Sequence, residues 1–298
     1  MYSIFMRYGL RELFSLLDDK DPCPCICGEN ITIGEPLSGE LFPDATAAAE
    51  LIPYCGKSRY LSRKDTDIIT GLYSAEGIDF SGLPNSAVRL FRLSVNAFDA
   101  FVHTWMSEVP LESELLRFGR KIITAGGSGS DSHAEKRPAD TDRRVAELAA
   151  SNLSDSDVRL VLDTAYKVRH EIDRFRGLLR FIPNTGGGYI ARCEPDYFIL
   201  PALGDHFTRR FGNTSWVIVD GKRGICLVRP DGNAPELVSL SSAFAQNCIG
   251  SVAADPWEDL WKKYHRTVHN ESRKNPQLQR QFMPQRYWKN LPEMESGE

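Results

Sequence analysis

The sequence lacks any apolar run of the roughly 18–20 residues that a membrane-spanning helix requires. Its first 17 residues are interrupted by Arg7, Arg11 and Glu12, which the apolar region of a signal peptide would not carry. The chain has seven cysteines, and an odd number argues against a complete disulfide framework. These absences predict a cytoplasmic protein without a membrane partner.

Familiar catalytic and nucleotide-binding motifs are also missing. The chain has no GxGxxG or P-loop pattern, no GxSxG nucleophile elbow, no HExxH zinc motif and no paired CxxC. The run Gly186-Gly187-Gly188 lies between two predicted strands, whereas a phosphate-binding loop leads from a strand into a helix. We therefore predict no cofactor and no nucleotide-dependent or hydrolytic chemistry of a familiar kind.

Three cysteines, Cys23, Cys25 and Cys27, alternate within a stretch rich in proline and glycine. Structural zinc sites use ligand pairs two to four residues apart, followed by a second pair downstream. Here the next cysteine, Cys55, stands alone and has no histidine near it in the sequence. We expect an ordinary loop without a metal, and a zinc or iron site is the alternative that elemental analysis would reveal.

The composition that is present is that of a globular protein. The chain has 298 residues, of which 42% are hydrophobic and 26% charged, and its formal net charge is -4. This length is enough for one large domain or two ordinary ones. The net charge does not decide whether the protein binds nucleic acid, because phosphate binding needs only local positive charge.

Hydrophobic periodicity predicts an α+β protein whose first part, residues 1–123, is mainly helical. The longest apolar segment, Ser86–Met106, predicts a single central core helix because it is apolar on more than one face. A Gly/Ser-rich stretch within residues 124–140 predicts a flexible linker, or a loop within one domain. Residues 141–298 then form the α+β part.

The α+β part combines predicted strands with a predicted helix. Two β-hairpins are expected, from Leu178–Ile182 with Tyr189–Cys193 and from Trp216–Val219 with Ile225–Val228. A helix over Asp196–Phe211 separates them. The order of hairpin, helix and hairpin indicates an antiparallel sheet flanked by helices. Nearer the C-terminus, Pro276 and Pro284 each stand where a new helical turn can begin.

A basic and aromatic stretch occupies residues 261–290 of this otherwise acidic chain. It holds eight lysines and arginines against one acidic residue, Glu271, which gives a local net charge of +7. Lysine and arginine replace counterions on phosphates, asparagine and glutamine match base edges, and exposed aromatic rings stack on unpaired bases. We therefore predict that this stretch binds nucleic acid.

The predicted contacts divide by chemistry. Phosphates are assigned to Arg273, Lys274, Arg280, Arg286 and Lys289, base or sugar contacts to Asn275, Gln279 and Gln281, and stacking or base wedging to Tyr287 or Trp288. A second basic cluster upstream includes Arg176 and Arg180, which would extend the same surface if both clusters share a face.

The aromatic residues of this stretch have a structural alternative. Trp261, Tyr264 and Val268 are spaced i, i+3, i+7, so this helical face is also suited to packing on the sheet. Tyr287 and Trp288 are also suited to anchoring the C-terminal tail in the core.

Glu194, Asp196 and His206 are the weak candidates for catalysis or metal binding. The alternative for Asp196 is a helix cap, with Pro195 bending the chain into the helix. His206 would lie nearly three turns further along that helix, roughly 15 Å from Asp196, which is too far for direct contact. The residues alone therefore assign no catalytic group.

The C-terminal sequence carries a family resemblance. It rests on Arg273–Gln281, Met283–Trp288 and Leu291–Met294, and upstream on Phe175-Arg176-Gly177, Arg180-Phe181, Glu194-Pro195-Asp196, Leu200-Pro201, His206-Phe207, Trp216, Asp220 and Arg223-Gly224. Through these residues, positions 155–294 resemble an uncharacterised bacterial family described as probable DNA metabolism proteins. Members of that family often show Tyr-Asp-Gly near the start, where this chain has Arg7-Tyr8-Gly9.

The resemblance implies a setting in DNA repair or modification. Genes of that family typically lie beside one for a radical SAM protein of DNA modification or repair, and some relatives fuse a similar domain to a uracil-DNA glycosylase-like domain. We therefore expect a DNA-binding accessory protein, with DNA and a radical SAM enzyme as partners. The alternatives are an enzyme acting directly on DNA, glycosylase-like or nuclease-like, and a protein–protein adaptor without DNA contact.

Overall fold

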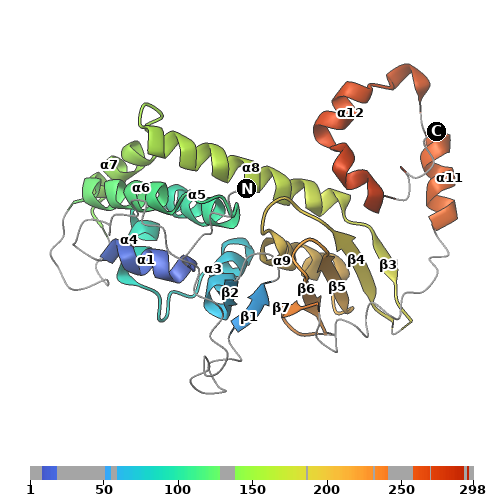
Figure 1. Ribbon diagram of the computed structural model, residues 1–298, viewed down its shortest axis with the longest axis horizontal. Helices are drawn as coiled ribbons and strands as arrows, with labels where there is room; N and C mark the ends of the chain where they lie inside the picture. Colours follow the sequence, from blue (N-terminus) through green and yellow to red (C-terminus); the bar gives the residue numbers. More distant parts are fainter. Residues whose placement is uncertain are drawn as a thin grey trace, which may run out of the picture. The chain divides into compact units, whose positions relative to one another are not determined.

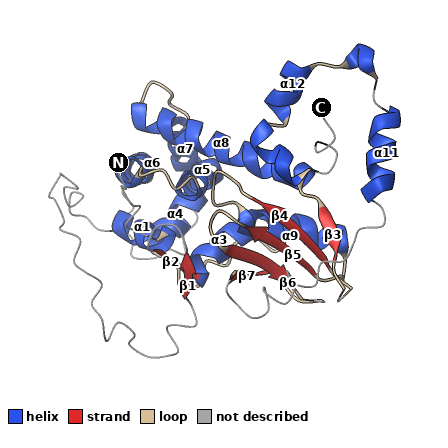
Figure 2. Ribbon diagram, turned by 45° about the vertical axis from the view of Figure 1, so that its right-hand side comes forward, coloured by secondary structure: helices blue, strands red, loops and turns tan. Residues whose placement is uncertain are grey.

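The computed structural model describes residues 9–18, 51–54, 59–127, 138–185, 187–230, 232–240, 258–268, 270–291 and 294. Helices and a five-stranded sheet within these residues confirm the predicted α+β class (Figures 1 and 2). The chain divides into two compact units, residues 1–51 with 61–169, and residues 52–60 with 170–298. This division falls inside the long helix α8 (Ser156–Leu178).

The first unit is helical in the residues described. Its helices are α1 (Leu10–Asp18), α3 (Arg63–Tyr73), α4 (Asn85–Leu93), α5 (Val95–Met106), α6 (Glu112–Ala125), α7 (Asp140–Ala150) and the first part of α8. Two short strands, β1 (Leu51–Tyr54) and β2 (Arg59–Ser62), lie where the chain passes between the two units, and they pair with each other in a sheet of their own. Helices α6 and α7 extend into both ends of the predicted linker, of which residues 128–137 lie outside the described residues.

The prediction of one helix over Ser86–Met106 was wrong, because the chain breaks at Ser94 into α4 and α5. Ser94 has extended backbone angles, φ -152° and ψ 108°, and its side chain accepts a hydrogen bond from the backbone N–H of Ala97 at 3.0 Å. A serine in this position caps a new helix. The break lets both helices bury apolar residues, with Phe98 of α5 stacking on Phe14 of α1 at a centroid distance of 5.4 Å.

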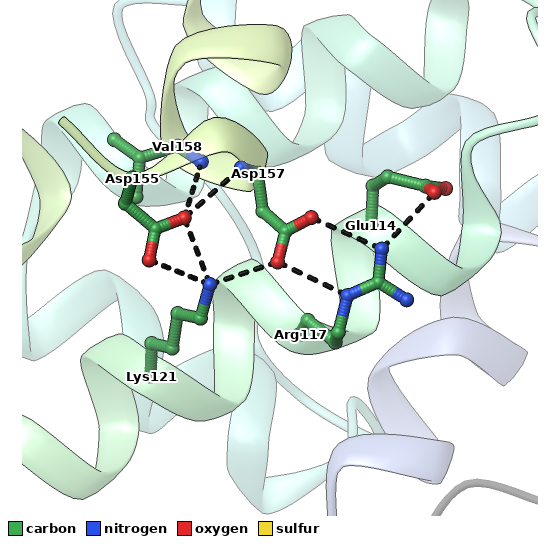
Figure 3. Close-up of polar contacts among 6 residues, drawn as sticks. All are labelled: Glu114, Arg117, Lys121, Asp155, Asp157 and Val158. Atoms are coloured by element: carbon green, nitrogen blue, oxygen red, sulfur yellow. Dashed lines mark hydrogen bonds and ion pairs between the residues drawn. The ribbon is translucent and has the colours of Figure 1, made fainter. Parts of the chain in front are cut away.

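An ion-pair network joins α6 to the start of α8 (Figure 3). Arg117 donates through Nε and Nη2 to the two carboxylate oxygens of Asp157, at 3.0 Å each. Lys121 bridges Asp155 and Asp157, at 2.7 and 2.8 Å. Asp155 also caps α8 by accepting from the backbone N–H of Val158. The hydrogen bonds from Arg117, and then those from Lys121, lower the pKa of Asp157 to about 2.

The second unit is built around a five-stranded sheet in the order β3-β4-β5-β6-β7 (Figure 2). The strands are β3 (Phe181–Pro183), β4 (Tyr189–Cys193), β5 (Trp216–Asp220), β6 (Ile225–Arg229) and β7 (Glu236–Ser239). The pairs β3–β4 and β5–β6 are antiparallel, which confirms both predicted hairpins, and β7 adds an antiparallel strand beside β6.

The expectation that the sheet is antiparallel throughout was wrong, because β4 and β5 pair in parallel. Tyr189 lies opposite Trp216 and Cys193 lies opposite Asp220. Helix α9 (Leu200–Phe211) connects the end of β4 to the start of β5, and such a strand–helix–strand crossover returns the chain in the same direction. The sheet is therefore mixed, with one parallel pair between two antiparallel ones.

The two central strands, β5 and β6, are buried along their whole length. Phe207 of α9 contacts Trp216 of β5, with ring centroids 6.3 Å apart, so α9 covers one face. Val217, Val219 and Cys226 belong to a separate apolar cluster on the sheet. Burial on both faces explains why these strands read as continuous apolar runs rather than as alternating ones.

Beyond the sheet, the C-terminal segment, defined here as residues 258–291, consists of short helices. They are α11 (Glu258–Val268), the 3-10 turn η1 (Glu271–Arg273), α12 (Pro276–Phe282) and the 3-10 turn η2 (Gln285–Asn290). Pro276 opens α12 and Pro284 precedes η2, as predicted. In both views α11 lies beyond the edge strand β3 (Figures 1 and 2). None of the described helices combines the length and apolar character that a bilayer crossing needs.

Candidate nucleic-acid interface

Contacts within the second unit bring the basic end of α8 together with the C-terminal segment. Arg174 donates from Nη2 to the backbone oxygen of Gln281 at 3.4 Å. The guanidinium carbon of Arg180 lies over the ring of Trp261, 6.0 Å from its centroid. Two arginines of the upstream basic cluster thus contact the C-terminal segment, which the sequence alone did not establish.

Glu171 is the buried centre of this junction, with 1% of its surface exposed. Its Oε1 accepts from the hydroxyl of Tyr287 at 2.6 Å and from the backbone N–H of Asp196 at 2.9 Å. Its Oε2 accepts from the backbone N–H of Tyr197 at 2.8 Å. A carboxylate is tolerated in such a position when donors surround it. Glu171 therefore ties η2 and the turn after β4 to helix α8.

Arg286 closes the outer side of this junction. Its Nη2 donates to the hydroxyl of Tyr287 at 2.8 Å and pairs with Oδ2 of Asp196 at 2.6 Å. The ring of Tyr287 packs edge-on against Phe175, with centroids 4.9 Å apart. Burial, and then the neighbouring Glu171, raise the pKa of Tyr287, so its hydroxyl stays protonated and able to donate.

The turn that follows β4 is also held from the sheet. Arg223, which is buried, donates to the backbone oxygens of Pro195 at 2.9 Å and Asp196 at 2.8 Å. The same guanidinium pairs with the buried Asp220 at 2.9 Å. Burial raises the pKa of Asp220, and the charge of Arg223 opposes this change. Two buried charged groups thus fix the backbone of the turn.

These contacts give Asp196 a structural role. Its carboxylate pairs with Arg286, and its backbone N–H is bound by Glu171. The alternative that Asp196 caps the next helix was wrong, because α9 begins at Leu200 and Ile199 holds the cap position. Glu194, the other carboxylate of this turn, is exposed.

The third catalytic candidate, His206, lies on α9. Its ring meets that of Phe207 edge-on, with centroids 4.8 Å apart. Burial lowers the pKa of His206, and the positive charges of Arg176 and Arg210 lower it further. The imidazole is therefore neutral at neutral pH. Its surroundings are aromatic and cationic, which differs from the carboxylate setting expected of a metal ligand or catalytic dyad.

The cations predicted to bind phosphates differ in how they are held. Arg273 at the end of η1, Lys274 in the link that follows it and Arg280 on α12 are all exposed. Arg286 is half exposed and pairs with Asp196, as described above. For Lys289 the side chain lies outside the described residues. The first three are therefore the cations of this set best placed to meet a polyanion.

Of the upstream pair, Arg176 binds Asp173 at 3.0 Å. Arg180 donates to the backbone oxygen of Gly177 at 2.9 Å and also covers Trp261.

The polar residues predicted to meet bases lie at α12. The Oδ1 of Asn275 accepts from the backbone N–H of Leu278 at 3.0 Å, so this atom caps α12. Gln279 and Gln281 are exposed on the same helix, and Nε2 of Gln279 contacts the sulfur of Met294 at 3.8 Å. The side-chain oxygen of Asn275 is therefore occupied by capping α12, whereas Gln279 and Gln281 are exposed residues with no capping role.

The aromatic residues divide into two groups. Tyr287 is only 3% exposed, and Trp288 is half-buried and donates from Nε1 to the backbone oxygen of Met283 at 2.9 Å. Tyr287 therefore fits the core-anchor alternative. Trp261 and Tyr264 on α11 are 40% and 56% exposed, so the alternative that this face packs on the sheet was wrong.

Sequence reasoning missed Glu171. Its signal was its position on α8, three residues after Val168 and four before Phe175, both of which are buried. Residues at these spacings share one helical face, so a carboxylate there falls among apolar neighbours. A charged residue on the apolar face of a helix therefore predicts a buried polar contact.

Within the part of the chain that the structure describes, no group of three or more His, Cys, Asp or Glu residues is arranged to hold a metal ion. The segment Cys23–Cys27, considered above as a zinc or iron site, lies outside the described residues.

A family model matches residues 142–293, which is just over half of the chain, and the family is described as a domain of unknown function, DUF4130. The match starts close to residue 141, where the sequence predicts the α+β part to begin, and it includes the buried junction around Glu171 and the C-terminal segment. No match was found among curated proteins or among solved structures.

Proposed function

This chain belongs to the family of the domain of unknown function DUF4130, and we propose that it is a DNA-binding accessory protein in DNA repair or modification. The observation that carries the proposal is the exposed basic surface of the C-terminal segment, which is in contact with Arg174 of α8 and with Arg180 just beyond the end of that helix. The resemblance of residues 155–294 to DNA metabolism proteins supports DNA as the polyanion and a radical SAM enzyme as the partner.

The charge distribution supports a polyanionic ligand. Lys263 and Arg266 are exposed on α11, and Arg273, Lys274 and Arg280 are exposed between the start of η1 and the end of α12. These side chains belong to a stretch of net charge +7 in a chain of net charge -4. A local concentration of cations releases counterions when it meets a phosphate backbone, and this supplies sequence-independent affinity.

The test is the salt dependence of DNA binding by the full chain, with a matched pair of charge variants. Arg273→Ala/Arg280→Ala removes two exposed cations of the interface and leaves the junction around Glu171 intact. Arg144→Ala/Arg159→Ala removes two exposed cations from helices of the first unit. Binding to labelled single- and double-stranded DNA is measured at several salt concentrations.

We expect the interface pair to weaken binding to DNA of any sequence. We also expect it to reduce the slope of log affinity against log salt by about one for each phosphate that the variant no longer neutralises. The control pair should leave both quantities unchanged. The proposal fails if the unmodified protein binds no DNA at low salt, or if the control pair weakens binding as much as the interface pair.

A further inference from the structure

Helix α11 presents a pair of exposed aromatic residues, Trp261 and Tyr264. The rings of Trp261 and Tyr264 stack with centroids 5.8 Å apart and an interplanar angle of 29°. Leu260 and Val268, on the same helical face, are more than half exposed. Large apolar side chains clustered in this way on a surface mark a site of interaction.

Positive charge borders this aromatic pair. The guanidinium of Arg180 lies over the ring of Trp261. Lys263 and Arg266 are exposed on α11 itself, immediately before and two residues after Tyr264. At 3.6 residues per turn, Lys263 lies about 100° round α11 from Tyr264, whereas Arg266 lies on nearly the opposite side of the helix from the two rings. A ligand on the rings would therefore meet Arg180 at Trp261, and Lys263 is the nearer of the two α11 cations.

The combination of flat rings and flanking cations selects the ligand by its chemistry. The ligand must offer planar π surfaces for stacking and negative charges at close intervals. A duplex supplies the charges, but its bases are stacked on one another and their faces are covered. An acidic protein segment supplies the charges without a planar face at each step. An unpaired DNA strand supplies both, and arginine adds cation–π attraction to the stacking.

We propose that Trp261 and Tyr264 form a stacking platform for the unpaired bases of single-stranded DNA. This proposal rests on the proposed function and adds the form of DNA to it. The platform lies on α11, whereas the aromatic residues of η2 serve as anchors. The exposed cations of η1 and α12 would then hold the phosphates of the same strand or of an adjoining duplex.

The experiment compares full-length variants for binding to a labelled single strand and to a duplex of equal length at one low salt concentration. Trp261→Ala/Tyr264→Ala removes both rings, and Trp261→Phe/Tyr264→Phe keeps a ring at both positions. Tyr166→Ala is the matched control, because Tyr166 is a 57% exposed aromatic residue on α8 in the first unit. Circular dichroism and thermal melting verify that each variant is folded.

We expect the double alanine variant to lose about tenfold or more in affinity for the single strand, because each stacked base contributes on that order. Its affinity for the duplex should change by less than about threefold. The double phenylalanine variant should retain most of the single-strand affinity, and Tyr166→Ala should retain all of it.

The outcomes separate this proposal from the proposed function. If the unmodified protein binds DNA but the double alanine variant loses nothing, or loses the same factor on both forms, the platform is refuted and DNA binding stands. If a DNA-binding protein shows the loss in Tyr166→Ala as well, the platform is also refuted. If the unmodified protein binds neither form, both proposals fall, and an acidic protein becomes the occupant to test.

Discussion

The two ends of the C-terminal segment have the same kind of composition and are held differently. At one end, in η2, Tyr287 is buried against Phe175 and Glu171, and Arg286 covers it. At the other end, in α11, Trp261 and Tyr264 are exposed beside cations. An arginine next to an aromatic ring is therefore a structural anchor in one place and a candidate binding surface in the other.

The difference between the two ends originates outside the segment. The hydroxyl of Tyr287 binds Glu171, which precedes it by 116 residues. At α11, Arg180 reaches Trp261 from just beyond the end of α8, and this arginine leaves both rings of the aromatic pair exposed. Composition alone makes the aromatic residues of both ends candidates for binding nucleic acid. The contact with Glu171 buries Tyr287 and so removes this residue from the exposed surface.

Removing Glu171 should have the largest effect on the stability of the anchored end of the C-terminal segment. Glu171→Ala leaves the hydroxyl of Tyr287 and the backbone N–H groups of Asp196 and Tyr197 buried without an acceptor. Losing a buried charged partner in this way typically costs about 3–5 kcal/mol. We expect a loss of that order in the free energy of unfolding, measured by urea denaturation. Hydrogen exchange at the two amides should accelerate as well.

Asp173 provides the matched control for that experiment. It lies two residues after Glu171 on α8, is exposed, and forms a surface ion pair with Arg176. Exposed pairs of this kind contribute about 0–1 kcal/mol. A loss with Asp173→Ala as large as that with Glu171→Ala would show that the junction is not the source of the stability.

The same substitution of tyrosine by phenylalanine can be made at both ends of the C-terminal segment, and its expected effect on stability is smaller than that of removing Glu171. Tyr287→Phe removes one hydroxyl that donates to Glu171 and accepts from Arg286, and it leaves the ring on Phe175. We expect a loss of about 1–2 kcal/mol in the free energy of unfolding. Tyr264→Phe makes the same chemical change on the exposed end and should leave stability unchanged. Equal effects of the two substitutions on the denaturation midpoint would contradict the division into anchor and surface.

The fold was predictable where local signals decide it. Both hairpins were visible as paired apolar runs, and Pro276 begins α12 as its position predicts. The parallel pairing of β4 and β5 was missed because each hairpin is a local feature, and their mutual direction depends on the crossover through α9. The break at Ser94 was missed because apolar residues continue on both sides of the capping serine.

The candidate site was predictable in composition and less so in arrangement. The exposure of Arg273, Lys274 and Arg280 agrees with a binding role, which stays a prediction. The burial of Tyr287 depends on a partner on another helix, and no pattern within the C-terminal segment reveals that partner. A search for charged residues on the apolar face of α8 would have found Glu171 and predicted that hydrogen-bond donors from another segment surround it.

The ion-pair network of the first unit (Figure 3) should make the smallest of these contributions to stability, because its two cations are largely exposed to water. The side chains of Arg117 and Lys121 are 51% and 40% exposed, whereas that of Asp157 is 13% exposed. The depressed pKa of Asp157, about 2, gives stability that is complete above its ordinary value near 4 and is lost as the pH falls through 2. Solvent screening reduces this contribution to about 1 kcal/mol.

We therefore expect Asp157→Asn to lower the free energy of unfolding by about 1 kcal/mol at neutral pH. The difference from the unmodified protein should shrink between pH 4 and pH 2, because the native carboxylate becomes protonated there and no longer attracts Arg117 and Lys121. Asp163→Asn, at an exposed position on the same helix, should change the free energy of unfolding at neutral pH by much less. A difference that persists unchanged at pH 2 would mean that Asp157 stabilises α8 by its shape or its helix position rather than by its charge.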